Sequence, residues 1–168
     1  MANSPPHVSS LLSEVRPRRL MTALGLDIGT VRIGVGLARA GDDVALDLTV
    51  IVRKGTRVDV RAVLDLAQRH GANVLVVGLP PGADEGGRTA RIAAAFAAAA
   101  AVATGLPTML VDEADTTLEA DLELRALGLR AARRKRTIDQ HAARILLGRW
   151  LAGAPAATVA GRAADEPG

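Results

Sequence analysis

The stretch from Leu24 to Ala38 constrains the fold most strongly, because it consists of two apolar runs on either side of a short turn that contains glycine. Apolar runs bounded by turn residues predict a pair of β-strands. One acidic residue, Asp27, stands near the end of the first run. An ionised carboxylate in such an apolar strand is costly unless it has a partner. Asp27 is therefore either the anchor of a local turn or a ligand for a cation.

The remaining pattern predicts an α/β domain with a mixed sheet. Apolar runs predict five strands, at about 23–28, 33–38, 46–53, 73–80 and 106–111. Amphipathic or alanine-rich stretches predict four helices, at about 58–70, 87–104, 117–127 and 138–151. No helix separates the first three strands, so they should form an antiparallel meander, whereas the two later, continuously apolar strands suit parallel pairing. We expect the helices to pack on this sheet.

The last two predicted helices have recognisable beginnings. Thr116 followed by Glu119, and Thr137 followed by Gln140, match the capping box. The second box would place Asp139 in the first turn of the last helix, where the helix dipole favours an ionised carboxylate. Asp139 is thus either an ordinary first-turn acid or a functional one.

The composition of the chain changes near both ends. Residues 1–20 are polar and rich in serine and proline, which predicts a disordered extension, and residues 153–168 predict a flexible tail. Residues 21–152 are then the folded domain. The sequence shows no signal peptide and no apolar run long enough to span a bilayer, and it has no cysteine for a disulfide or a thiolate metal site. We expect a cytoplasmic protein that does not bind membranes.

The positive charge of the chain is carried mainly by arginine. Of 21 basic residues 19 are arginines, and the sequence pI is about 10.5. Arginine suits planar recognition of phosphate. A cluster of five basic side chains is either a solvated loop or a phosphate-binding patch: Arg130, Arg133, Arg134, Lys135 and Arg136. With only two aromatic residues, base-stacking platforms are not expected.

Acidic residues follow the ends of predicted strands. Asp27 ends the first strand, Asp112 and Glu113 follow the last one, and Asp139 lies in a helix that is expected to pack across the same edge. Ligands of open α/β sheets collect at the carboxyl ends of parallel strands. Asp112 and Glu113 point to opposite faces, so one of them should join Asp27 and Asp139. Three acids held close together require a cation, and all-oxygen ligands select Mg²⁺, Mn²⁺ or Ca²⁺. Acting on phosphate, such a cluster would support phosphodiester cleavage.

Two positions leave alternatives open. The glycines of segment 77–82 either end a strand or leave room for a backbone phosphate. His141 is two residues from Asp139 and does not share its helix face, so a structural or solvated role is expected for it.

Four motifs occur in a fixed order along the chain. They are Leu26-Asp27-Ile28-Gly29 with Arg32-Ile33-Gly34-Val35, Val77-Gly78-Leu79-Pro80 with Gly86, Asp112-Glu113 with Thr116-Thr117, and Lys135 with Ile138-Asp139 and Ala142-Ala143. This ordered set resembles the YqgF/RuvX family of resolvases and pre-ribosomal-RNA nucleases, within the ribonuclease H-like superfamily. The resemblance spans about residues 23–151.

The resemblance implies a metal-dependent nuclease with a ribonuclease H-like fold. Its catalytic acids and ligands of Mg²⁺ or Mn²⁺ would be Asp27, Glu113 and Asp139. From the residues themselves, Arg133, Arg134, Lys135 and Arg136 are the expected contacts to nucleic acid, and Arg32 is either a surface arginine near the site or a further phosphate contact. The implied substrates are branched or single-stranded DNA, in recombination and repair, or precursor 16S rRNA in ribosome biogenesis. A homodimer would suit a resolvase, which needs two active sites.

One position departs from the family pattern, and other classes of protein share part of it. The family usually has an arginine after the Asp-Glu pair, where this chain has Ala114 and then Asp115. Segment 27–30 also resembles the first phosphate motif of actin-like and sugar-kinase ATPases, which close two such domains around a nucleotide. A non-catalytic nucleic-acid-binding or scaffold module is the other alternative, since a fold does not by itself decide function.

Overall fold

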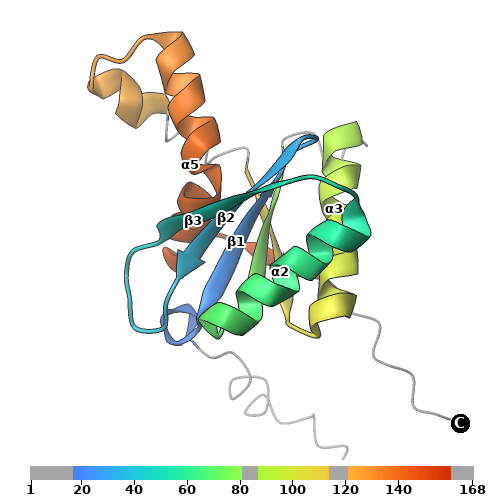
Figure 1. Ribbon diagram of the computed structural model, residues 1–168. Coiled ribbons are helices and arrows are strands. Elements are labelled where there is room, and N and C mark those ends of the chain that lie inside the picture. The colour runs from blue at the N-terminus through green and yellow to red at the C-terminus, as the bar shows by residue number, and fades with distance from the viewer. Residues whose placement is uncertain (1–16, 81–86, 114–120, 160–168) are drawn as a thin grey trace, which may run out of the picture.

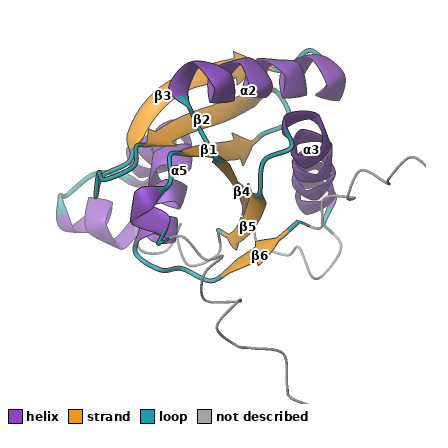
Figure 2. Cartoon of the chain, turned by 90° about the horizontal axis from the view of Figure 1, so that it is seen from below, coloured by secondary structure: helices purple, strands orange, loops and turns teal. Residues whose placement is uncertain are grey.

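The computed structural model describes residues 17–80, 87–113 and 121–159, except for the side chains of Lys135 and Asp139. One six-stranded sheet runs through it in the order β3-β2-β1-β4-β5-β6 (Figure 2). The strands are β1 (Ala23–Ile28), β2 (Arg32–Ala38), β3 (Leu46–Val52), β4 (Val74–Leu79), β5 (Thr108–Asp112) and β6 (Ala156–Thr158). The helices are η1 (Arg18–Leu20), α2 (Thr56–His70), α3 (Arg88–Thr104) and α5 (Ala131–Leu151).

The sheet combines both kinds of strand pairing, as predicted. Strands β1, β2 and β3 form an antiparallel meander, and β1, β4 and β5 pair in parallel. The prediction missed β6, which pairs antiparallel with β5 within the segment expected to be a flexible tail. This strand has three small or polar residues and no apolar alternation of its own, so only its pairing with β5 creates it.

Helices cover both faces of the sheet. Figures 1 and 2 show α2 and α3 on one face and α5 on the other. In β1, Leu24, Leu26 and Ile28 belong to the core beneath α2 and α3, whereas Ala23 belongs to the core beneath α5. Side chains alternate between the faces of a strand. Asp27 therefore lies on the same face of the sheet as α5.

Glycines bring α5 close to the sheet. A Cβ atom at Gly25 would lie 2.9 Å from the carbonyl oxygen of Ala143, and one at Gly36 would lie 3.1 Å from the same oxygen. A side chain at Gly25 would also collide with Leu147. The two glycines thus set the depth at which the middle of α5 packs.

The last helix begins at Ala131, seven residues before the predicted start. Thr137 is not an N-cap, because it lies inside α5 and its hydroxyl donates to the carbonyl oxygen of Arg133 at 2.9 Å. Alanine and arginine are strong helix formers, and they extend the helix back to the turn at Gly128, where φ is +75°. Asp139 is consequently in the third turn of α5, not the first. The predicted box at Thr116 lies outside the described residues, although residues 121–126 are helical.

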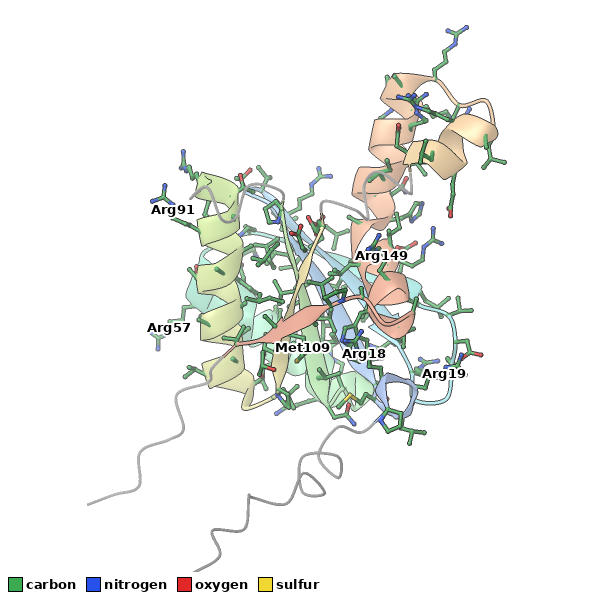
Figure 3. The ribbon with its side chains drawn as sticks, turned by 180° about the vertical axis from the view of Figure 1, so that it is seen from behind. Arg18, Arg19, Arg57, Arg91, Met109 and Arg149 are labelled. Carbon is green, nitrogen blue, oxygen red and sulfur yellow. The ribbon has the colours of Figure 1, made fainter. Side chains whose placement is uncertain are left out.

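The described structure includes residues that precede the predicted domain boundary. Residues 18–20 form η1 within the segment expected to be disordered. Arg18, labelled in Figure 3, donates to the carbonyl oxygens of Trp150 at 2.6 Å and Ala154 at 2.8 Å, and its guanidinium lies 5.3 Å from the centroid of the Trp150 ring. These contacts with the end of α5 hold η1 in place. Among the helices described, none combines the length and the apolar character needed to cross a bilayer.

Candidate active site

Two carboxyl groups meet at the carboxyl edge of the parallel strands. Asp27 is near the end of β1, and Glu113 directly follows β5, where its backbone N–H donates to the carbonyl oxygen of Leu79 at 2.8 Å. The side chains of Asp27 and Glu113 are hydrogen-bonded to each other. Because β4 lies between β1 and β5, the Glu113 side chain reaches across the end of β4 to make this contact.

Gly78 provides the space for that crossing. It lies in β4 opposite Val111, one residue beyond the pairing of Leu26 with Val77. A Cβ atom at this position would overlap the Glu113 carboxyl group, with the Cδ atom only 2.6 Å away. Gly78 therefore has a role besides the two alternatives considered from the sequence: its lack of a side chain makes room for the Glu113 carboxyl group.

The surroundings of Glu113 favour its protonated form. Burial raises the pKa of Glu113 from 4.5 to about 7, together with the charge of Asp27, the hydrogen bond with Asp27 and the charge of Asp112. A protonated Glu113 carboxyl group can donate to the Asp27 carboxylate. Of the two acids at the end of β5, Glu113 reaches Asp27, whereas Asp112, the last residue of the strand, is exposed.

The third predicted acid is placed only by its backbone. Asp139 lies in α5, four residues before Ala143, and its side chain is outside the described part of the structure. A Cβ atom on Gly34 would lie 3.6 Å from the Asp27 Cβ atom and 3.8 Å from the Ala143 Cβ atom, so the middle of α5 passes close to Asp27. Among the described side chains, no group of three acids or histidines is arranged to hold a metal ion.

A cleft of about 730 Å³ opens beside Asp27. The turn between β1 and β2 forms one side, and the exposed residues Arg136 and Gln140 of α5 form the other. Its lining residues are Asp27, Gly29, Thr30, Val31, Arg32, Gly34, Val50, Arg136 and Gln140. Of these, the sequence predicted Asp27, Arg32 and Arg136 as site residues. Gln140 was noted only for a capping box, and Val50 joins the cleft only through the pairing of β3 with β2.

The basic cluster is helical, and its members have different surroundings. Arg133 and Arg136 are exposed on the first half of α5, which extends beyond the sheet in Figure 1. Arg134, which was predicted to contact nucleic acid, donates to Asp121 at 2.8 Å and to the carbonyl oxygen of Leu129 at 2.6 Å, so its guanidinium group is engaged within the protein. It fastens α5 to the helical segment before it. The side chain of Lys135 is outside the described residues, as is all of Ala114.

His141 makes an interelement contact that sequence reasoning did not anticipate. Its Nδ1 atom lies 2.6 Å from an Asp47 carboxylate oxygen, which links α5 to the edge strand β3. The contact agrees with a structural role for this histidine.

Comparison with solved structures identifies the class of fold. The fold is ribonuclease H-like, as predicted: the structure of "T. thermophilus RuvC in complex with Holliday junction substrate" aligns with a TM-score of 0.54 and 19% identity over 82% of this chain and 99% of that chain. At that identity, the likeness shows the fold alone.

The particular family follows from sequence. The family model RuvX, described as "Holliday junction resolvase", matches residues 21–153. A protein of Anaeromyxobacter dehalogenans (strain 2CP-C) is 37% identical over 132 residues, which cover 78% of this chain and 96% of the relative. One of Synechococcus sp. (strain JA-2-3B'a(2-13)) is 40% identical over 136 residues, which cover 78% of each chain. Both are named "Putative pre-16S rRNA nuclease". This chain belongs to the RuvX family of nucleases, and the predicted family is confirmed.

Proposed function

We propose that the chain hydrolyses phosphodiester bonds of nucleic acid at the edge of the sheet, with Asp27, Glu113 and Asp139 as the catalytic acids. The observation that carries the proposal is the hydrogen-bonded pair of Asp27 and Glu113 carboxyl groups beside an open cleft. Two carboxyl groups in contact retain a proton near neutral pH because both cannot easily be charged together.

The pair suits a divalent cation. Its donors are all carboxylate oxygens, which Mg²⁺ and Mn²⁺ prefer, and a cation would offset the charge that otherwise keeps Glu113 protonated. Asp27 and Glu113 would hold the ion, with Asp139 as the third ligand from α5. A bound ion of this kind activates water and stabilises the leaving oxygen.

The chain's own residues would position the nucleic acid. Arg32 and Arg136 come from opposite sides of the cleft and are exposed, so both can contact phosphates on either side of the cleaved bond. Arg133, one turn before Arg136 on α5, extends the basic surface away from the cleft.

The proposed substrate is precursor 16S rRNA, which rests on the names of the relatives, and the proposed compartment is the cytoplasm. The description of the family supports a second candidate, branched DNA in recombination or repair, for which a homodimer would provide two active sites. The experiment incubates the purified chain with precursor rRNA, single-stranded DNA and a four-way DNA junction, each with Mg²⁺, Mn²⁺ or EDTA. Metal-dependent cleavage of at least one substrate is expected; cleavage of none would leave the non-catalytic module.

Gly78→Ala should reduce cleavage strongly without changing any acid. The added methyl group would push the Glu113 carboxyl group away from Asp27, and misplacement by about 1 Å can cost roughly a hundredfold in rate. Single-turnover rates measure the effect. Gly148→Ala is the matched control, because a Cβ atom at that helical glycine meets no atom within 4 Å. Equal rates for the two variants would contradict the proposed crossing of β4 by Glu113.

Replacing Arg133 and Arg136 by glutamine should weaken binding of every nucleic acid tested. Each lost phosphate contact should reduce the slope of log affinity against log salt by about 0.7 to 0.9. Titrations between low and moderate salt measure the slope. Arg134→Gln is the matched control, since loss of its contacts with Asp121 and Leu129 should lower the thermal midpoint and leave the slope unchanged. A slope unaffected in the double variant would make the helix surface an ordinary solvated one.

A further inference from the structure

The cleft beside Asp27 is lined by apolar side chains as well as by two arginines. Val31 and Val50 both line it, and they are 65% and 55% exposed. Arg32 and Arg136 line the same cleft from the strand side and the helix side. A volume of about 730 Å³ is in the range of small-ligand sites. The cleft therefore offers both charged and apolar surface to a single ligand.

Backbone pairing holds the apolar wall close to the carboxyl pair. Val50 is opposite Gly34 in the ladder between β2 and β3, and a Cβ atom on Gly34 would lie only 3.9 Å from an Asp27 carboxylate oxygen. The carbonyl oxygen of Val31 accepts a hydrogen bond from the Arg53 N–H at 2.9 Å, which ties the turn to the end of β3. In the sheet, Gly34 is thus the residue between Val50 and Asp27.

We propose that this cleft binds one unpaired nucleotide next to the cleaved phosphate. Its sugar and base pack against Val31 and Val50, its flanking phosphates face Arg32 and Arg136, and the exposed Gln140 side chain hydrogen-bonds the edge of the base. The inference rests on the proposed function and adds to it the state of the substrate at the cut.

The chemistry of the wall favours an unpaired nucleotide over one in a duplex. A base within a helix has both faces stacked and its pairing edge occupied, whereas an unstacked base offers a face and an edge. The amide group of glutamine supplies both a donor and an acceptor. The chain's two aromatic side chains, Phe96 and Trp150, are buried, so aliphatic contact is what the protein provides for a ring face. Such contact tolerates any base.

The test combines removal of a base with removal of the wall. Oligonucleotides of single-stranded RNA and DNA carry an abasic residue at one position at a time, and binding is measured in the Asp27→Asn background with Mg²⁺, so that cleavage is prevented. One abasic position should weaken binding by roughly three- to tenfold. Val50→Ser should weaken binding of the intact oligonucleotide by a similar factor and make that abasic position neutral. Val102→Ser, which changes a 70% exposed valine on α3, is the matched control and should change neither.

Two results would overturn the nucleotide site: the absence of any sensitive position, or an abasic penalty that persists in Val50→Ser. Thermal melting of both serine variants shows that they are folded. Cleavage by the wild-type chain is measured separately. If the abasic penalty disappears in Val50→Ser but the wild-type chain cleaves no substrate, the proposed nuclease chemistry is refuted and the nucleotide site stands. If the wild-type chain cleaves but the abasic penalty does not depend on Val50, the nucleotide site is refuted and the nuclease chemistry stands.

Discussion

Replacement of Asp27 by asparagine is expected to reduce cleavage by about a thousandfold or more at saturating Mn²⁺. Asparagine has nearly the shape of aspartate but lacks the negative charge that attracts a hard divalent cation. A bound metal ion supplies several kcal/mol of transition-state stabilisation, and each ~1.4 kcal/mol corresponds to a factor of ten in rate. Single-turnover rates on the substrate that the wild-type chain cleaves best measure the loss.

The control for Asp27→Asn is the same change on the opposite face of the sheet. Asp65 lies on α2 and pairs with Arg61 at 3.5 Å, so Asp65→Asn should cleave at nearly the wild-type rate. Unfolding by urea should show that both variants remain folded under the assay conditions, which separates lost chemistry from lost folding. Rates for Asp27→Asn that equal those of Asp65→Asn would remove Asp27 from the catalytic acids.

Features that depend on local pattern were predictable from the sequence. Apolar runs with turn residues at their ends located β1 to β5 because both signals act within a few residues. The approach of Asp27 to an acid at the end of β5 was also predictable, because parallel strands present their carboxyl ends at one edge. The start of α5 was not, since the capping signal at Thr137 is weaker than the helix propensity of the alanines and arginines before it.

Features that depend on distant partners could not be predicted. Neither Arg18 nor β6 has a local signal: Arg18 is held by the end of α5, and β6 exists through its pairing with β5. The sequence does not distinguish Arg134 from its basic neighbours, because its partner Asp121 lies 13 residues away along the chain. The role of Gly78 requires the strand order β1-β4-β5, because only then does Glu113 have to cross β4 to reach Asp27.

Glu113→Gln is expected to abolish cleavage and, without metal, to make the folded chain more stable at pH 8. The pKa of Glu113 is raised from 4.5 to about 7 by burial and by Asp27, so the folded state holds this proton more tightly than the unfolded state does. The resulting stabilisation is complete below about pH 4.5 and is lost as the pH rises through about 7. A glutamine amide stays neutral and can still donate to Asp27, so this loss is absent in the variant.

The measurement is the free energy of unfolding by urea in EDTA, at pH 5 and at pH 8, for the wild-type chain and the variant. At each pH the free energy of unfolding of the wild-type chain is subtracted from that of the variant, which cancels the contributions of the other titrating groups. This difference should rise by on the order of 1–3 kcal/mol from pH 5 to pH 8, since one pKa unit is worth about 1.4 kcal/mol. Asp112→Asn is the control: Asp112 acts on Glu113 only through its charge, as the last of the causes, so its effect should be smaller. Added Mg²⁺ should stabilise the wild-type chain at pH 8 much more than the glutamine variant, because the ion binds the folded state through the deprotonated pair. If both proteins show the same pH dependence and the same gain from Mg²⁺, Glu113 neither holds the proton nor binds the ion.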